Sequence, residues 1–178
     1  MKLNNLIFTA LAGFSIILAG CQNNDENEQH YDNKLFISAS NFTKEILFKA
    51  GDTNVETGLS VAIAKPEEHD IKVTMSPAPE LLSTYKLAYY DETAVLLSEE
   101  HYSMPETSTT IKSGSIVSPE LPIEFINTGE LDIKTTYVLP VTIKSVEGIG
   151  VLQSAKTYYY VFRGASLINV VCNISRNR

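Results

Sequence analysis

Tyrosine rings are the side chains of this sequence best suited to binding a sugar. A flat ring can cover the apolar face of a pyranose while neighbouring polar groups hydrogen-bond its hydroxyls. The chain has nine Tyr and no Trp; Tyr89 and Tyr90 precede Asp91, and residues 158–160 are three consecutive tyrosines. In a strand, Tyr159 faces the side opposite to Tyr158 and Tyr160. We therefore expect Tyr158 and Tyr160 to face the core and Tyr159 to be the exposed ring. We take Tyr89, Tyr90 and Tyr159 as candidate glycan-contact residues, with packing in the core as the alternative.

Histidine stands among acidic residues at two places, in EEHD at 67–70 and in EEH at 99–101. A zinc site needs several converging N, O or S ligands. Adjacent residues of an extended chain point to opposite faces, so either cluster offers only about two ligands. No calcium-loop signature accompanies them. We therefore expect solvated turns, no metal site and no cofactor.

Catalytic motifs are absent from the sequence. The Gly-x-Ser-x-Gly motif of a nucleophile elbow does not occur. A glycosidase needs two carboxylates roughly 5–9.5 Å apart, and no motif singles out such a pair among the 21 acidic residues. Cys172 lies in an apolar run, which is typical of an inert small hydrophobe. We therefore predict no catalytic residue and expect that the protein is not an enzyme.

Cys21 has the most specific chemistry near the N-terminus. Lys2, an apolar stretch at 6–19 and small residues form the three parts of an export signal. As a helix that stretch spans roughly 20 Å, short of the ~30 Å hydrocarbon core. The sequence LAGC at 18–21 resembles a bacterial lipobox, in which cleavage precedes the cysteine and diacylglycerol joins its sulfur. We expect residues 1–20 to be a lipoprotein signal peptide and Cys21 to hold the chain to a membrane by its acyl chains; the alternative is an ordinary signal peptide with an incidental cysteine.

The segment after Cys21 is polar and acidic. Asp25, Glu26 and Glu28 stand in it without an apolar neighbour between 22 and 28, so residues 21–33 are expected to form a flexible tether. Acidic residues close to the lipid cysteine resemble the surface-export signal of Bacteroidetes lipoproteins. That resemblance implies the outer face of the outer membrane, and a tether facing the periplasm is the alternative.

Charge and cysteine count narrow the partners. The formal net charge is −7, which disfavours nucleic acid because nucleic-acid binding needs a basic face. With Cys21 acylated, Cys172 has no intrachain partner, so we expect no disulfide.

Period-two alternation dominates from Lys34 onward and is typical of strands with one buried face. Turn residues separate the alternating runs, and no strand–helix–strand repeat occurs. This organisation favours an all-β sandwich. The eight predicted strands lie at 35–38, 45–49, 59–64, 71–76, 109–112, 121–125, 137–144 and 156–162.

Two features interrupt the pattern. The segment PAPELLSTYKLAYY at 77–90 carries apolar residues near helical spacing after Pro79, which predicts a short helix that crosses between the sheets. Pro140 falls inside a predicted strand, which suggests an edge position or a bulge there.

Several phrases together resemble one domain family: YDNKLFIS at 31–38, VAIAKPEEHDIKVTMSPAPELLSTY at 61–85, TIKSGSIVS at 110–118, YVLPVTIKSVEG at 137–148 and SAKTYYYV at 154–161. The family is the domain of unknown function at the N-terminus of many Bacteroidetes surface lipoproteins, and the resemblance covers about residues 31–163. It implies an immunoglobulin-like β-sandwich of about 7–8 strands, usually encoded among polysaccharide-utilisation genes. In larger relatives the domain precedes a lectin-like domain or a chitinase-like endoglycosidase, whose Asp-x-x-Asp-x-Asp-x-Glu string is absent here.

The sequence thus predicts four parts: a signal peptide at 1–20, a tether at 21–33, a sandwich at 34–163, and a tail or the start of a missing second domain at 164–178. The expected function is that of a non-catalytic accessory in glycan binding and polysaccharide utilisation at the outer-membrane surface. Its expected partners are the membrane, a glycan, or other outer-membrane glycan-uptake proteins. The alternatives are a structural spacer or assembly module without a ligand, and a truncated remnant of an endoglycosidase or lectin-like lipoprotein.

Overall fold

The computed structural model describes residues 32–51 and 54–165. From Asn33 onward these residues belong to one compact unit. The signal peptide, Cys21, all of the tether but its last two residues, and the tail from residue 166 with Cys172 lie outside the described residues.

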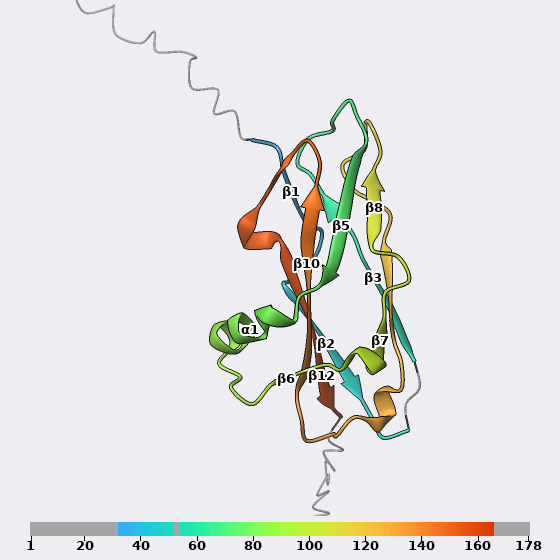
Figure 1. The fold of residues 1–178 in the computed structure, drawn as a ribbon, viewed down its shortest axis with the longest axis vertical. Helices are drawn as coiled ribbons and strands as arrows, with labels where there is room; N and C mark the ends of the chain where they lie inside the picture. The colour runs from blue at the N-terminus through green and yellow to red at the C-terminus, as the bar shows by residue number, and fades with distance from the viewer. Residues whose placement is uncertain (1–31, 52–53, 166–178) are drawn as a thin grey trace, which may run out of the picture. The chain divides into compact units, whose positions relative to one another are not determined.

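The unit is an all-β, immunoglobulin-like sandwich with one short α-helix, as the sequence predicts (Figure 1). Its helix α1 covers Leu82–Tyr89 and follows a single 3₁₀ turn, η1, at Pro79–Leu81. The strands are β1 (Lys34–Ile37), β2 (Thr43–Phe48), β3 (Val55–Leu59), β4 (Val61–Ala62), β5 (Ile71–Pro77), β6 (Val95–Leu96), β7 (Tyr102–Ser103), β8 (Ser108–Ile111), β9 (Leu121–Phe125), β10 (Tyr137–Val146), β11 (Gly150–Val151) and β12 (Thr157–Gly164).

One layer has the strand order β2-β12-β10-β5-β8. Strand β10 is antiparallel to both β12 and β5, and β2 runs parallel to β12. The opposite layer consists of two three-stranded sheets, β3-β9-β7 and β11-β1-β4. These two sheets join because β3 and β4 follow each other along the chain with only Ser60 between them.

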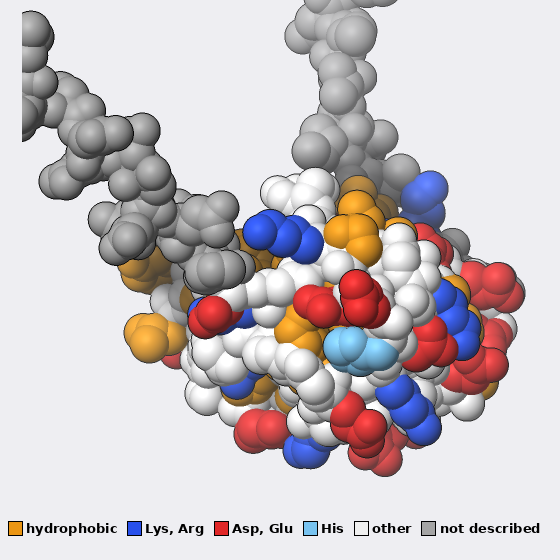
Figure 2. All heavy atoms as spheres, turned by 90° about the horizontal axis from the view of Figure 1, so that it is seen from above, with side chains coloured by type: hydrophobic (Ala, Val, Ile, Leu, Met, Phe, Trp, Pro, Cys, Tyr) orange, Lys and Arg blue, Asp and Glu red, His pale blue; other side chains and the backbone are white. Residues whose placement is uncertain are grey.

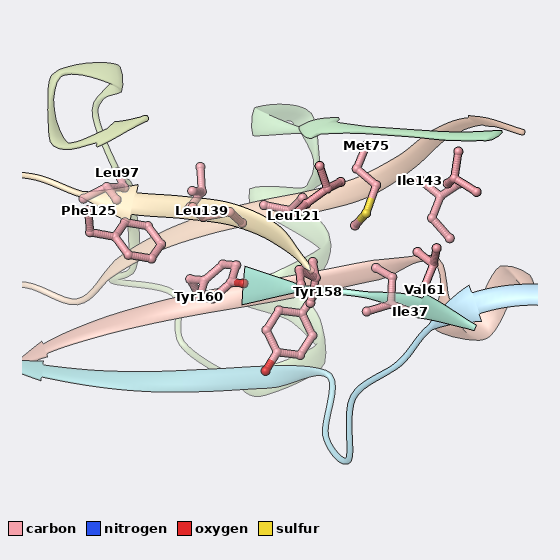
Figure 3. Packing of buried hydrophobic residues seen from close by; sticks show 14 of the residues in the cluster. Ile37, Val61, Met75, Leu97, Leu121, Phe125, Leu139, Ile143, Tyr158 and Tyr160 are labelled. Carbon is pink, nitrogen blue, oxygen red and sulfur yellow. The ribbon is translucent and has the colours of Figure 1, made fainter. Parts of the chain in front are cut away.

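The core fills the space between the layers. Ile71, Val73 and Met75 on β5 are buried while Lys72 between them is exposed, and β9 alternates in the same way. In Figure 3 the labelled side chains come from both layers and point toward one another. Burying each large apolar side chain of this kind contributes about 1.5–3 kcal/mol to the free energy of unfolding. The side chains that the period-two pattern places in the core are therefore the main source of stability.

The eight predicted strands agree with the structure in place, although the described residues form twelve strands. Each of the eight contains or overlaps a strand, although the predicted strand at 59–64 is divided at Ser60 into β3 and β4. The sequence did not predict β6, β7 and β11, since two residues are too few to show alternation.

Pro140 is neither on an edge strand nor at a bulge, so that prediction is wrong. Strand β10 is central, and the shift in its register lies between Ile143 and Ser145. Ile143 donates its N–H to Lys156 next to β12, so the nitrogen of Pro140, three residues earlier, faces the other side. On that side β5 has just ended, since Pro77 pairs with Val141. The missing N–H of proline therefore faces the gap where the chain departs toward α1.

Helix α1 does not cross between the sheets, which corrects the second expectation. The chain leaves the layer at the end of β5 and returns to it as β6, which pairs with β10 in parallel. Figure 1 shows α1 beside β10 and β12 on the outside of that layer. The physical reason is a second apolar cluster on this outer face, which needs a cover; its buried members are Tyr85, Ala94, Val138, Tyr159 and Val161. In the described part of the chain, no helix has the length and apolar character that crossing a membrane requires.

Candidate functional site

The tyrosine run of β12 is divided between two environments. Tyr158 and Tyr160 face the core between the layers, and Tyr159 faces outward. Tyr159 is nevertheless only 7% exposed, because α1 lies over it. The prediction of opposite faces is therefore confirmed, while the expectation that Tyr159 is exposed is wrong. Its role in glycan contact stays a prediction.

Three tyrosine rings meet beneath and beside α1, and we call Tyr85, Tyr89 and Tyr159 the tyrosine cluster. Tyr85 and Tyr89 are one helical turn apart and stack with ring centroids 4.8 Å apart. Tyr159 contacts both, at 5.3 Å from Tyr85 and 6.0 Å from Tyr89. Tyr85 is buried, whereas Tyr89 is 41% exposed. The cluster is thus a fixed base from which one ring reaches the surface.

Burial also changes the acidity of the cluster. It raises the pKa of Tyr85, an effect that the nearby Asp91 carboxylate reinforces and the Arg163 guanidinium partly offsets. Burial raises the pKa of Tyr159 as well. Both hydroxyls therefore stay protonated across the neutral range.

Tyr90 ends α1 in an unusual conformation. It adopts φ 55° and ψ 35°, in the left-handed region, and its backbone N–H donates to the carbonyl of Lys86. Glycine normally takes this position, and another residue there costs of order 1–3 kcal/mol. The Tyr90 side chain is 92% exposed and so recovers little of that cost by packing. A strained, exposed aromatic residue is a hint of function.

A hollow of about 170 Å³ lies beside the tyrosine cluster. Strand β2 contributes Thr43 and Glu45 to it because β2 pairs in parallel with β12, which places Glu45 opposite Val161 on the same outer face. In the part of the chain that the structure describes, the hollow is lined by Thr43, Glu45, Tyr85, Tyr89, Val161 and Arg163.

Charged groups surround one side of this hollow. The Arg163 Nε lies 3.5 Å from the Glu45 Oε1, and its Nη2 lies 3.7 Å from the Asp91 Oδ2. Asp91 also accepts a hydrogen bond from the Thr93 hydroxyl at 3.1 Å. The Arg163 guanidinium and the Glu45 carboxylate, which line the hollow, supply the donors and acceptors that sugar hydroxyls use. The sequence placed Asp91 beside the tyrosines, but it gave no signal for Arg163, Glu45 or Thr43.

Two larger grooves, of about 640 and 380 Å³, share Gly58 and Glu120. The Glu120 side chain packs over Gly58, where a Cβ would have no room. Carboxylates of Glu56 and Glu124 line the larger groove, and the one aromatic residue of the smaller groove is the buried Tyr158. Neither groove offers an exposed ring, so the hollow by α1 is the better candidate despite its smaller volume.

The acidic residues near His69 are used in turn structure. Asn33 donates to Glu67 at 2.6 Å, and Lys112 donates to Asp70 at 2.8 Å. The bond from Lys112, with a second from the Ser113 N–H, lowers the pKa of Asp70. Figure 2 looks onto this end of the sandwich and shows a histidine among interspersed acidic and basic side chains.

The second histidine cluster, at residues 99–101, also does not resemble a metal site. His101 is buried and lies 3.8 Å from Glu100, with its Nδ1 3.3 Å from the Ile126 carbonyl oxygen. Within residues 32–51 and 54–165, no three His, Cys, Asp or Glu side chains gather as metal ligands would.

Solved structures from Bacteroides share this fold. A candidate carbohydrate-binding protein of Bacteroides ovatus superposes with a TM-score of 0.65 and 18% identity, covering 73% of this chain and 36% of its own. EndoBT-3987 of Bacteroides thetaiotaomicron, solved with a Man5GlcNAc product, superposes with a TM-score of 0.61 and 19% identity, covering 73% of this chain and 30% of its own. An auxiliary nutrient-binding protein of the same species superposes with a TM-score of 0.52 and 15% identity, covering 72% of this chain and 46% of its own. The chain thus spans less than half the length of each.

A search of curated proteins found no match. A family model for an N-terminal domain matches residues 31–150, about two thirds of the sequence. The chain therefore belongs to this N-terminal domain family, the one from Bacteroidetes proteins that its sequence phrases resemble.

Proposed function

We propose that the protein is a non-catalytic glycan-binding accessory and that the hollow beside α1 receives the sugar. The observation that carries the proposal is Tyr90, an almost fully exposed ring held in a strained backbone conformation next to Tyr89. The protein would be more stable with glycine at this position. Glycan binding would explain why an aromatic residue stands there instead.

The hollow suits one sugar unit of a longer glycan. Its volume of about 170 Å³ is below the ~300 Å³ at which pockets for drug-sized ligands begin. The exposed ring of Tyr89 would cover the apolar face of that unit, while Glu45 and Arg163 bond its hydroxyls. The next unit would lie against Tyr90. The carbohydrate-binding and nutrient-binding descriptions of the structural neighbours support this reading.

The same hollow is poorly arranged for hydrolysis. A glycosidase needs one carboxylic acid to protonate the leaving group and a second carboxylate across the scissile bond. Here Glu45 and Asp91 both engage the single guanidinium of Arg163. EndoBT-3987 was solved with a Man5GlcNAc product, but this chain covers only 30% of it. These observations favour binding over catalysis.

Replacing Tyr90 with glycine is expected to separate binding from stability. The variant should gain about 1 kcal/mol in the free energy of unfolding, because glycine adopts φ 55° without strain. Loss of the ring should weaken glycan binding about tenfold, equivalent to about 1.4 kcal/mol of stacking. Urea denaturation and affinity electrophoresis in polysaccharide gels measure the two effects.

Leu87→Ala is the matched control, since Leu87 lies on the same helix and is 75% exposed. It should change neither quantity appreciably. Glycan retention that is equal in wild type and Tyr90→Gly would refute the assignment of the site.

We also propose that the protein is lipid-anchored through Cys21 at the outer face of the outer membrane. Replacing Cys21 with alanine should move the protein from the membrane pellet to the soluble fraction, because acyl chains provide the anchoring energy. Protease added to whole cells should digest the wild-type protein. Survival of the protein in intact cells, with digestion after lysis, would place it on the periplasmic side.

A structural spacer or assembly module is the second candidate function. In the neighbours that we compare, the matching part makes up 30–46% of a longer chain, and the exposed Leu87 and Tyr90 could equally contact another protein surface. Absence of retention across a broad panel of polysaccharides would favour this function.

A further inference from the structure

We infer that the hollow beside α1 selects uncharged sugar units and rejects acidic ones such as uronates and sulfated sugars. The inference rests on the proposed function and adds the class of ligand. It depends on the charges that face the hollow, which differ from those of a typical anion site.

Among the described residues that line the hollow, Arg163 is the one cation. Its guanidinium is shared between Glu45 and Asp91, at 3.5 and 3.7 Å. The three groups together carry one net negative charge. A sugar carboxylate or sulfate would compete with two protein carboxylates for the same guanidinium and would face their repulsion.

Nearby basic residues do not reverse this balance. Lys44 follows Thr43 on β2, but its Nζ donates to the Thr57 hydroxyl at 2.6 Å and thus reaches toward β3 in the opposite layer. Lys86 lies on α1 but is not part of the lining of the hollow.

Uncharged sugars, by contrast, match the groups that are present. Of the lining residues, the Glu45 carboxylate accepts hydrogen bonds from hydroxyls, and the guanidinium of Arg163 donates to hydroxyl or ring oxygens. The Glu45 and Arg163 side chains are about half exposed, so added salt should screen the repulsion of acidic sugars and reduce the selectivity.

Matched pairs of polysaccharides test the inference. Dextran with dextran sulfate, and galactan with polygalacturonate, differ mainly in charge, and a wider set of neutral polysaccharides identifies a ligand for the purified protein. Retention in affinity gels at low salt should be clearly weaker for the acidic member of each pair than for the neutral one. Glu45→Gln should strengthen retention by the acidic members roughly tenfold, because one of the two repelling carboxylates is lost.

Glu106→Gln is the control, since Glu106 is an exposed carboxylate between β7 and β8, outside the lining of the hollow. It changes the net charge equally and should leave the selectivity unchanged. Stronger wild-type retention by an acidic polysaccharide than by its neutral counterpart would overturn the inference while leaving glycan binding intact. Equal effects of the two substitutions would also overturn it, since net charge alone would then explain the selectivity. Retention by no polysaccharide would refute the proposed function itself.

Discussion

Replacing Tyr159 with alanine is expected to lower the free energy of unfolding by about 3–5 kcal/mol, the range for removing a large buried aromatic side chain. Tyr159 is 7% exposed and contacts both tyrosines of α1. Without its ring, α1 loses the centre of the apolar cluster that holds it on β10 and β12. An eight-residue helix is not stable alone, so α1 should open locally as well.

Urea denaturation followed by circular dichroism measures the global loss, and limited trypsin digestion reports the local opening through cleavage after Lys86. Tyr159→Phe is the control because it keeps the ring and should change stability by about 1 kcal/mol or less. A loss below 1 kcal/mol for the alanine variant would show that α1 does not depend on this residue. The alanine variant should also lose glycan binding, since the position of Tyr89 depends on the cluster.

Much of the sandwich could be predicted because alternation is a local signal. On β5 and β9, every second residue enters the core while its neighbours meet solvent, and hydropathy records that difference directly. Strand β12 is different, with five consecutive buried residues from Tyr158 to Phe162. Alternation cannot say whether an outward face is covered, and here the cover is a helix from a distant part of the sequence. The burial of Tyr159 therefore could not be read from its own segment.

The candidate site was predictable only in part for a related reason. Tyr89, Tyr90 and Asp91 are neighbours along the chain, so their types alone suggested a polar aromatic surface. Glu45 and Arg163 come from two strands far apart in sequence, and the parallel pairing of β2 with β12 brings them together. Strand register depends on which faces are buried across the whole sheet, and no local spacing encodes it.

Alkaline pH is expected to destabilise the protein steeply, and the tyrosines are the reason. Burial raises the pKa of five of them, Tyr85, Tyr102, Tyr158, Tyr159 and Tyr160. In the unfolded chain a tyrosine ionises near pH 10. Their contribution to stability is therefore fully present below about pH 10 and is lost as the pH rises above it, because only the unfolded state releases the protons.

Tyr160 should contribute most to this loss. It is completely buried beside Phe125, and burial raises its pKa far above the ordinary value. Its hydroxyl has no hydrogen-bond partner among the described residues. The Thr57 hydroxyl is close enough to offset a little of the rise in pKa, but its geometry does not make a hydrogen bond. Ionising Tyr160 inside the fold is thus strongly unfavourable. Through this residue the first pH unit above 10 should remove about 1 kcal/mol of stability, and the slope should then approach about 1.4 kcal/mol per pH unit.

Tyr160→Phe isolates this effect from the other groups that titrate at high pH. At pH 7 the variant should be as stable as the wild type or more stable by about 1 kcal/mol, because the lost hydroxyl was buried without a partner. Between pH 10 and 11, urea denaturation should show a loss of stability about 1 kcal/mol smaller than in the wild type. Equal losses in the two proteins would mean that Tyr160 ionises without unfolding. A variant that is clearly less stable at pH 7 would mean that the hydroxyl is hydrogen-bonded in the native protein, in which case Thr57 is its partner.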